Sequence, residues 1–173
     1  MTMPAPLPFS IRPDTAADHL PIEALLRAAF AGNPHSDGSE ALIVARLRAR
    51  GRLARSLVAS GADGVLLGHC AFSPVTIDGA DLGWMGLGPL GVLPAAQGKG
   101  VGAALVEAGL ALLRADGAAG CVVLGEPAYY RRFGFRNETR LRYPGAPPEY
   151  FMAALMNEEM VPEGLVRYDE AFG

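Results

Sequence analysis

The sequence predicts an α+β fold in α/β/α layers, with a mixed, mainly antiparallel sheet flanked by helices. Three observations support this prediction. Short apolar segments rich in Val, Leu and Phe recur along the chain, which is typical of strands. An Asp78-Gly79 pair separates two of them, which indicates an antiparallel hairpin. Longer segments between the strands carry apolar residues at helical spacing.

In the first third of the chain we expect one strand and two helices. Phe9 to Arg12 forms a short strand, and Pro13-Asp14 then opens a helix whose apolar positions extend to Phe30. Residues 31–38 are a polar turn region. A second helix follows from about Ser39, which is placed to cap it. Its buried face is predicted from Leu42, Ile43 and Leu47.

The middle of the chain predicts three strands and a helix. The strands cover 55–60, 65–76 and 84–92, with turns at Gly61–Gly64 and at Asp78-Gly79. The last of these strands leads into a glycine-rich loop. A strongly apolar helix then covers 101–116 and ends at Asp116-Gly117.

The C-terminal third predicts a buried strand at 121–124, because this short segment is wholly apolar. Glu126-Pro127 begins a short helix, since proline is favourable in a first turn. Phe133-Gly134-Phe135 leads to a further strand. The tail contains two more apolar segments, 150–155 and 165–168.

Size and composition indicate a single globular domain over residues 1–173. The chain of 173 residues is long enough to bury a core, half of its residues are hydrophobic and 19% are charged. The net charge of −3 comes with scattered arginines, which argues against nucleic-acid binding. No apolar stretch reaches the roughly 20 residues that span a bilayer, so no membrane segment is expected.

The cysteines and histidines predict neither a disulfide nor a metal site. Cys70 and Cys121 both lie in apolar segments and are expected to be buried free thiols in a reducing compartment. His19, His35 and His69 show no metal-ligand spacing. Met1 to Pro8 lacks the basic flank and apolar centre of a signal peptide, so we expect a cytoplasmic protein.

The most informative segment is 87–103, in which a strand feeds a loop that contains Gly98, Gly100 and Gly102. Glycines allow the backbone to approach a ligand closely. The first turn of the following helix has free N–H groups and a partial positive charge. This arrangement predicts a phosphate or pyrophosphate site.

Two general phosphate motifs fit this segment poorly. A Walker-type loop fails because Gly100 follows Lys99 where Ser or Thr is required, and Leu93 replaces the leading glycine. The dinucleotide fingerprint remains an alternative, since Gly98, Gly100 and Ala103 fit its pattern and Glu126 lies at a suitable distance. Five residues from Leu93 to Gln97 separate its first glycine from the strand, however, and the hairpin upstream is not a βαβ unit.

The segment from Leu90 to Gly102 instead resembles the acyl-CoA signature of the GNAT acetyltransferase superfamily, with Gln97, Gly100 and Gly102 at the expected spacing. The sequence Tyr130-Arg-Arg-Phe-Gly-Phe135 resembles the second motif of that family. The segment 125–135 and the C-terminal residues are similar to its YhbS-type branch. The resemblance covers essentially the whole chain and implies the GNAT-like acyl-CoA N-acyltransferase fold.

The resemblance implies acetyl-CoA, with no metal, as the co-substrate. Backbone N–H groups of the glycine loop would bind its pyrophosphate, and the strand ending at Val92 would bind its pantetheine arm. An N–H near Leu90 or Gly91 would polarise the thioester carbonyl. The implied cofactor-binding residues are Leu90, Gly91, Val92, Gln97, Gly98, Lys99, Gly100, Val101, Gly102 and Ala103.

Tyr130 matches the family tyrosine that protonates the departing thiolate, and packing against pantetheine is its alternative role. Tyr129, one residue earlier on the helix, is expected to point in another direction and to be a core or wall residue. Glu126 is the candidate base. An alternative of equal weight is that its carboxylate only stabilises the start of the short helix through the helix dipole. Weaker base candidates are Glu40, Asp37 and His35 in the early loop and helix, and Ser73; His69 is expected to be a core histidine.

The sequence therefore predicts an N-acetyltransferase that transfers acetyl from acetyl-CoA to an amine, either a small molecule or a protein amino group, by direct attack. A non-catalytic CoA-binding regulatory module is the alternative, and a dinucleotide-binding protein is a further one. The apolar C-terminal strands leave a homodimer open. Neither the acceptor nor the acyl chain is identified by the sequence.

Overall fold

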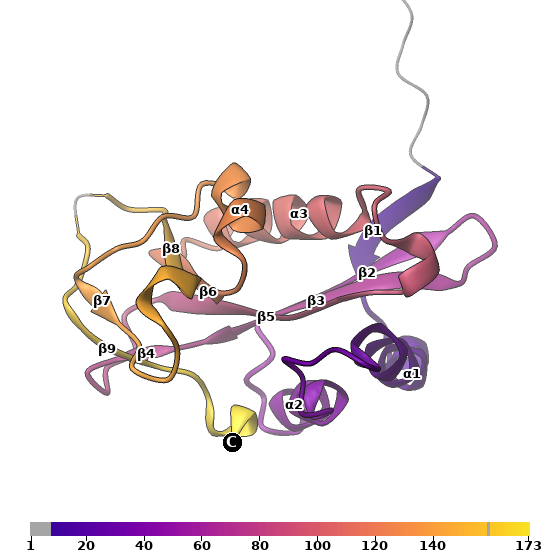
Figure 1. Ribbon diagram of the computed structural model, residues 1–173, viewed down its shortest axis with the longest axis horizontal. Helices are drawn as coiled ribbons and strands as arrows, with labels where there is room; N and C mark the ends of the chain where they lie inside the picture. Colours follow the sequence, from indigo (N-terminus) through magenta and orange to yellow (C-terminus); the bar gives the residue numbers. More distant parts are fainter. Residues whose placement is uncertain (1–7, 159) are drawn as a thin grey trace, which may run out of the picture.

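The computed structural model describes residues 8–158 and 160–173, and its centre is a six-stranded sheet (Figure 1). The strand order is β1-β2-β3-β5-β6-β8. Only the β5–β6 pair is parallel, and the other four pairs are antiparallel. The expected mixed, mainly antiparallel sheet is therefore confirmed. The strands are β1 (Phe9–Pro13), β2 (Arg55–Gly61), β3 (Leu66–Pro74), β5 (Trp84–Val92), β6 (Gly120–Leu124) and β8 (Phe151–Leu155).

A second, smaller sheet of three short strands was not foreseen from the sequence. It has the order β4-β9-β7, with β4 (Thr76–Ile77), β9 (Gly164–Arg167) and β7 (Leu141–Arg142). β4 continues the chain just after β3, because the predicted strand 65–76 is interrupted at Val75. This sheet brings the C-terminal tail beside the central hairpin.

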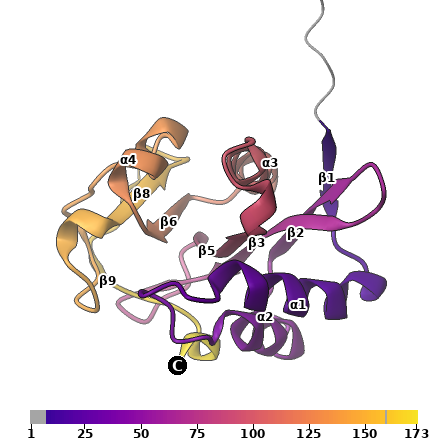
Figure 2. The same ribbon diagram turned by 45° about the vertical axis from the view of Figure 1, so that its right-hand side comes forward.

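Helices cover both faces of the large sheet, as Figures 1 and 2 show. α3 (Val101–Ala115) and the short α4 (Pro127–Tyr130) lie on one side, and α1 (His19–Phe30) and α2 (Glu40–Ala49) lie on the other. α2, α3 and α4 begin within about one residue of their predicted starts, whereas α1 begins only at His19, after a 3-10 turn, because Pro13 still belongs to β1. Short 3-10 turns complete the described elements: Ala16–Asp18, Pro94–Ala96, Arg131–Phe133, Pro148–Tyr150 and Glu170–Phe172.

Apolar residues from alternate strand positions form separate cores on the two faces. Under α3, Phe72, Leu105 and Leu113 are fully or almost fully buried. Gly109 lets α3 approach β3 closely, since a Cβ there would overlap the Phe72 ring. On the opposite face, Ile22 and Leu26 of α1 pack on Val58 and Ala71.

The predicted hairpin turn is confirmed. Ile77 and Ala80 form an antiparallel bridge, with Asp78 at φ 49° and Gly79 at φ 81°. Two successive positive φ values define the turn type for which Asp-Gly is favoured. The Asp78 carboxylate also accepts a hydrogen bond from the Leu165 N–H at 2.8 Å, which fixes β9 beside the turn.

Three local predictions need correction. Directly after Phe135 only Arg136 is paired, in an isolated bridge with Ala153 through its N–H and C=O, and the next strand, β7, begins at Leu141. Leu42 of α2 is exposed rather than part of the buried face. Ser39 occupies the N-cap position, but its hydroxyl bonds to Asp37 and caps no helical N–H.

The N-terminal segment used for the signal-peptide argument lies almost wholly outside the described residues. Within the described part of the chain, no helix combines the length and apolar character that crossing a bilayer would need.

Candidate functional site

The parallel strands β5 and β6 separate after four paired positions. Their register runs from Trp84 with Gly120 to Leu87 with Val123, and β5 then continues alone to Val92. Beyond this point β5 stays paired only with β3, with the Leu93 N–H donating to the Leu67 carbonyl at 2.9 Å. Since backbone groups alternate sides along a strand, those of Leu90 and Val92 point into the gap that β6 leaves. This edge can accept an extended ligand as an added strand.

The glycine loop continues this edge and opens α3. Gly98 and Gly100 adopt φ values of 74° and 83°, in the left-handed region that favours glycine. The first helical hydrogen bond runs from the Ala104 N–H to the Gly100 carbonyl at 3.0 Å. The N–H groups of Val101, Gly102 and Ala103 precede that bond and have no helical acceptor. The start of α3 therefore offers three donors and the positive end of a helix dipole.

These donors line a cavity of about 360 Å³ between the loop and α4. Seven of the ten predicted cofactor residues line it: Val92, Gln97, Gly98, Gly100, Val101, Gly102 and Ala103. Ala96, Tyr129 and Arg132 complete the lining. The arrangement suits a diphosphate bound by backbone donors beside one side-chain cation.

Three predicted cofactor residues lie outside this cavity. Lys99 lines a different hollow, together with Phe9 and Leu67. Leu90 and Gly91 lie farther back along β5, where Leu90 presents its backbone to the open edge. A Cβ on Gly91 would instead meet Leu26 of α1.

Gln97 has a local structural task. Its side-chain amide donates to the Val92 carbonyl at 3.1 Å, which ties the loop to the end of β5. The glutamine of the sequence motif therefore fixes the loop geometry while its backbone borders the cavity.

Tyr129 lies in the wall of this cavity, one of the two places expected for it, whereas Arg132 was not predicted. The Tyr129 hydroxyl lies 2.5 Å from where a Cβ of Gly102 would stand, so the tyrosine lies directly against the first turn of α3. The Arg132 guanidinium lies over the Tyr129 ring, 4.4 Å from its centroid. The spacing of these two residues by three positions on a short helix was the available signal, since it places them on one side.

Tyr130 is almost fully buried in an aromatic cluster. Its ring lies edge-on to those of Tyr129, Phe133 and Phe135, with centroids 5.0 to 6.4 Å apart. A Cβ on Gly125 would overlap the Tyr130 ring, so glycine is required where β6 ends. Burial raises the pKa of Tyr130 well above its ordinary value, which keeps the phenol protonated.

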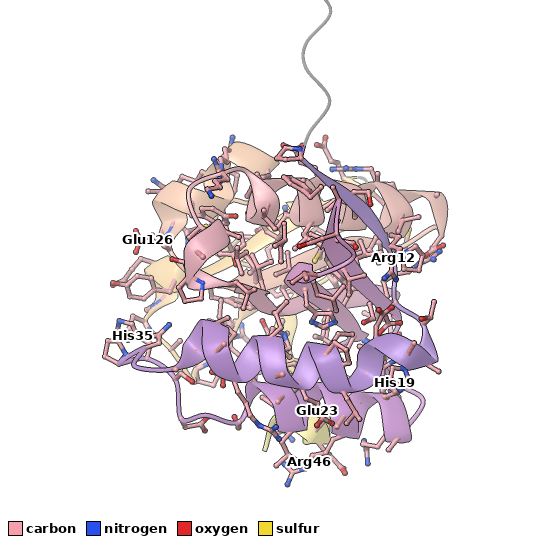
Figure 3. The ribbon with its side chains drawn as sticks, turned by 90° about the vertical axis from the view of Figure 1, so that its right-hand side faces the viewer. Arg12, His19, Glu23, His35, Arg46 and Glu126 are labelled. Carbon is pink, nitrogen blue, oxygen red and sulfur yellow. The ribbon has the colours of Figure 1, made fainter. Side chains whose placement is uncertain are left out.

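Glu126 follows at the N-cap of α4, where its backbone carbonyl accepts from the N–H of Tyr130 at 3.1 Å. The Glu126 side chain is exposed. Figure 3 shows it on the same side of the molecule as His35 from the α1–α2 loop, with both side chains extending outward.

The other early-loop candidates are engaged in local hydrogen bonds. Asp37 accepts from the side chain and backbone of Ser39, which lowers the pKa of Asp37. The Glu40 carboxylate accepts a hydrogen bond from the Ser36 hydroxyl. Both carboxylates thus shape the loop before α2.

His69 and Ser73 are both buried in β3. His69 Nε2 is 2.8 Å from the Ser56 hydroxyl, and its Nδ1 has no partner among the described residues. Burial lowers the pKa of His69 from 6.5 to about 4. His69 is therefore a neutral core histidine, as expected, and Ser73, one of the weaker base candidates, is a fully buried core residue.

Cys70 and Cys121 are buried free thiols, as the sequence predicted. Burial raises the pKa of both thiols, so neither supplies a thiolate nucleophile. Among the described residues, no group of three or more His, Cys, Asp or Glu side chains is placed to hold a metal ion.

Comparison with known proteins decides the family. The acetyltransferase (GNAT) domain model matches residues 52–137. The N-acetyltransferase YhbS of Escherichia coli K12, itself uncharacterized, is 40% identical over 167 residues, which cover 94% of this chain and 97% of YhbS. The chain belongs to the GNAT N-acetyltransferase family. This membership supports the acyl-CoA interpretation of the glycine loop over the dinucleotide alternative.

Solved structures agree over nearly the whole chain. A GNAT family acetyltransferase from Brucella melitensis, in complex with acetyl-CoA, is 46% identical with a TM-score of 0.85, covering 95% of this chain and 98% of that one. YhbS from Escherichia coli, in complex with CoA, is 38% identical with a TM-score of 0.88, covering 99% and 95%. The predicted YhbS-type resemblance is thus confirmed.

Proposed function

We propose that this GNAT member transfers the acetyl group of acetyl-CoA to a primary amine by direct attack. The main observation behind the proposal is the open backbone edge of β5, which ends in the donor-lined cavity at the start of α3. An elongated ligand with an amide-bearing arm followed by a diphosphate fits this edge and this cavity in turn. The Brucella melitensis and Escherichia coli relatives, described in complex with acetyl-CoA and CoA, support the same ligand.

Each part of the site takes one part of the co-substrate. The backbone of Leu90 and the N–H of Val92 would hydrogen-bond the pantetheine arm, and the N–H groups of Val101, Gly102 and Ala103 would bind the diphosphate. Arg132 would add a charge-assisted contact to a phosphate. Such fixed orientation of the thioester contributes several kcal/mol to catalysis.

Proton transfers complete the reaction. As the amine nitrogen bonds to the thioester carbon and the carbon–sulfur bond breaks, the Tyr130 hydroxyl donates its proton to the departing sulfur. A phenol held protonated by burial suits that role. Glu126, directly or through water, would accept the proton that the amine loses. The thiols and the buried His69 take no part.

We further propose that residues 1–173 act as one domain in the cytoplasm, with no nucleic-acid or membrane partner. The buried position of Cys70 and Cys121, which form no disulfide, supports a reducing compartment. A homodimer through the C-terminal strands is also part of this proposal.

The test measures thiol release from acetyl-CoA with a panel of primary amines and detects the acetylated product by mass spectrometry. We expect acceptor-dependent release at rates well above hydrolysis. If CoA binds but no amine accelerates thiol release, the chain is a CoA-binding module and the proposed function is wrong.

A further inference from the structure

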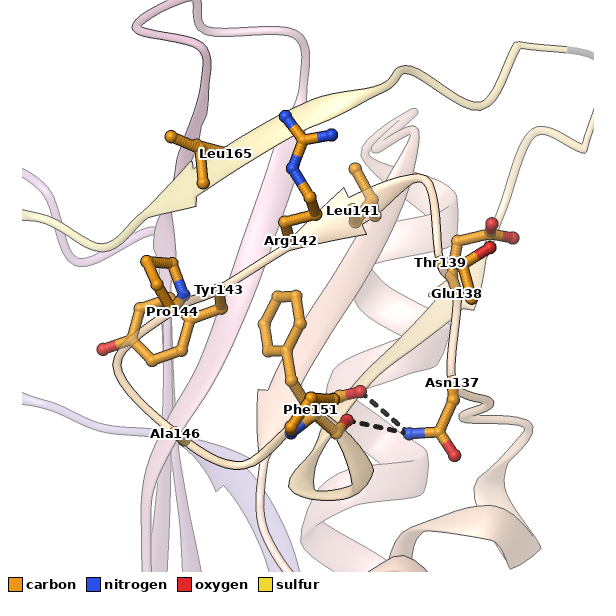
Figure 4. Close-up of a pocket in the computed structure, with 11 residues that line it drawn as sticks. Asn137, Glu138, Thr139, Leu141, Arg142, Tyr143, Pro144, Ala146, Phe151 and Leu165 are labelled. Carbon is orange, nitrogen blue, oxygen red and sulfur yellow. Dashed lines mark hydrogen bonds between the residues drawn. The ribbon is translucent and has the colours of Figure 1, made fainter.

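A second and larger cavity, of about 540 Å³, lies on the face of the large sheet opposite α3 (Figure 4). It is open to solvent and bordered by the segment from Asn137 to Pro148, by Phe151 at the start of β8 and by Leu165 of β9. Phe151 belongs to the apolar cluster that also contains Trp84 and Val122, on the opposite side of the sheet from the α3 core. The cavity therefore does not overlap the proposed diphosphate site.

The cavity adjoins the end of the strand that leads to the proposed catalytic residues. Phe151 pairs with Leu124, the last residue of β6, and both side chains lie on the same face of the sheet. The next residue, Gly125, donates its N–H to the Tyr150 carbonyl at 3.0 Å. Glu126 follows directly. A molecule held against Phe151 thus lies one strand away from the gap between β5 and β6.

Most of the lining surface is formed by carbon atoms, and most of its polar groups already form hydrogen bonds within the protein. Tyr143 and Phe151 pack with ring centroids 5.4 Å apart. The Asn137 amide donates to the carbonyls of Pro148, Glu149 and Phe151, which fixes the shape of the loop. Figure 4 shows two of these amide bonds beside the cavity.

The charged groups at the rim discriminate between kinds of amine. The Glu138 carboxylate forms two hydrogen bonds of 2.9 Å with the Arg140 guanidinium, so it is neutralised by that partner. Arg142 is the cation at this rim, 4.0 Å from Glu163 and largely exposed. A second ammonium group would meet Arg142 and no unpaired carboxylate in the described lining, which disfavours a polyamine.

We propose that this cavity binds the apolar side group of the acceptor, and that the acceptor is a primary amine with one positive charge and an aromatic or branched aliphatic group. This inference rests on the proposed function. A volume of about 540 Å³ lies in the usual range for small-molecule pockets. Burial of a phenyl or branched group is worth roughly 1.5 to 3 kcal/mol, or about 10- to 150-fold in selectivity.

The test uses two readouts, so that the cavity and the reaction can fail separately. The first is kcat/KM for phenethylamine, isopentylamine, ethanolamine and putrescine at saturating acetyl-CoA. The second is direct binding of phenethylamine to the CoA-saturated protein by calorimetry. We expect kcat/KM for the two apolar amines to exceed that for ethanolamine and putrescine by at least about 10-fold. In the calorimetric experiment, where CoA carries no acetyl group and no reaction can occur, we expect phenethylamine to bind.

Ala146→Trp fills the cavity from its half-buried lining position, and Ala111→Trp on the exposed side of α3 is the matched control. Leu165→Ala, at a partly exposed site, is a second variant that leaves the core intact. We expect Ala146→Trp to abolish phenethylamine binding and the apolar preference, Leu165→Ala to weaken both, and the control to change neither.

Equal kcat/KM for the four amines would overturn the inference, as would phenethylamine binding that Ala146→Trp leaves unchanged. If no amine reacts at all, the proposed function fails, while the calorimetric arm still decides the cavity. In that case, phenethylamine binding that is sensitive to Ala146→Trp supports the cavity, and lack of binding to the wild type refutes it.

Discussion

Replacement of Gly102 by alanine tests the geometry of the cavity at the start of α3. The added Cβ would lie 2.5 Å from the Tyr129 hydroxyl, about 0.9 Å short of ordinary contact. The Tyr129 ring is confined by the Tyr130 ring and by the Arg132 guanidinium, with centroid distances of 5.0 and 4.4 Å. Either the tyrosine or the helix start must therefore move, and both line the cavity. Overpacking of this kind costs about 1–3 kcal/mol.

We expect Gly102→Ala to weaken CoA binding by about 10- to 100-fold, equal to roughly 1.4–2.8 kcal/mol. The loss of folding stability should be smaller, since alanine favours the helix by about 1 kcal/mol relative to glycine. Isothermal titration with CoA measures the affinity, and thermal unfolding measures the stability.

A double-mutant cycle with Tyr129→Phe isolates the cause. Without the hydroxyl, the nearest atoms to the new Cβ are Val92 Cγ2 at 3.6 Å and Tyr129 Cζ at 3.7 Å, both ordinary contacts. Gly102→Ala should then change the CoA dissociation constant by less than about 3-fold relative to Tyr129→Phe alone. An equal loss in both backgrounds would refute this reasoning, because the clash with the hydroxyl would not be its source.

Three other perturbations have defined outcomes. Tyr130→Phe should lower kcat, measured by stopped flow, by about 100-fold or more, while the calorimetric affinity for CoA changes little. Equal losses in kcat and in CoA affinity would show that the Tyr130 ring serves binding alone. Because burial lowers the pKa of His69 from 6.5 to about 4, its contribution to stability is complete above pH 6.5 and is lost as pH falls to 4, by about 3 kcal/mol. Urea unfolding of His69→Gln should lack that part of the pH dependence; an unchanged slope would contradict it. Gly109→Ala, whose Cβ would overlap Phe72, should destabilise the fold by about 3 kcal/mol, whereas Ala111→Gly at an exposed site of α3 should cost only about 1 kcal/mol in chemical denaturation.

Local patterns in the sequence predicted most of the fold. The Asp78-Gly79 pair, the strand 84–92 and the helix beginning at Val101 each depend on short-range chemistry, and the structure places all three as expected. The smaller sheet depends on contacts between segments far apart in the chain. Leu141 pairs with Gly164 through a two-residue strand, which is too short to show a pattern.

The site was predicted to different depths. The backbone donors of the glycine loop follow from residue type and position, because glycine spacing and a helix start are visible in the sequence. The three-residue spacing of Tyr129 and Arg132 places them on one side of their segment, but that this side faces the start of α3 depends on how α4 packs there, which the spacing does not fix. The cavity beside Phe151 is formed by an irregular loop and a distant strand, and its residues carry no motif.

The central claim is that the start of α3 and the edge of β5 bind the diphosphate and the arm of CoA. Calorimetric titration of the purified chain with CoA, pantetheine and NAD tests it most directly. The account predicts saturable binding of CoA, binding of pantetheine at least about 100-fold weaker because it lacks the diphosphate, and no binding of NAD. Pantetheine binding as tight as that of CoA, or binding of NAD in preference to CoA, would contradict the account.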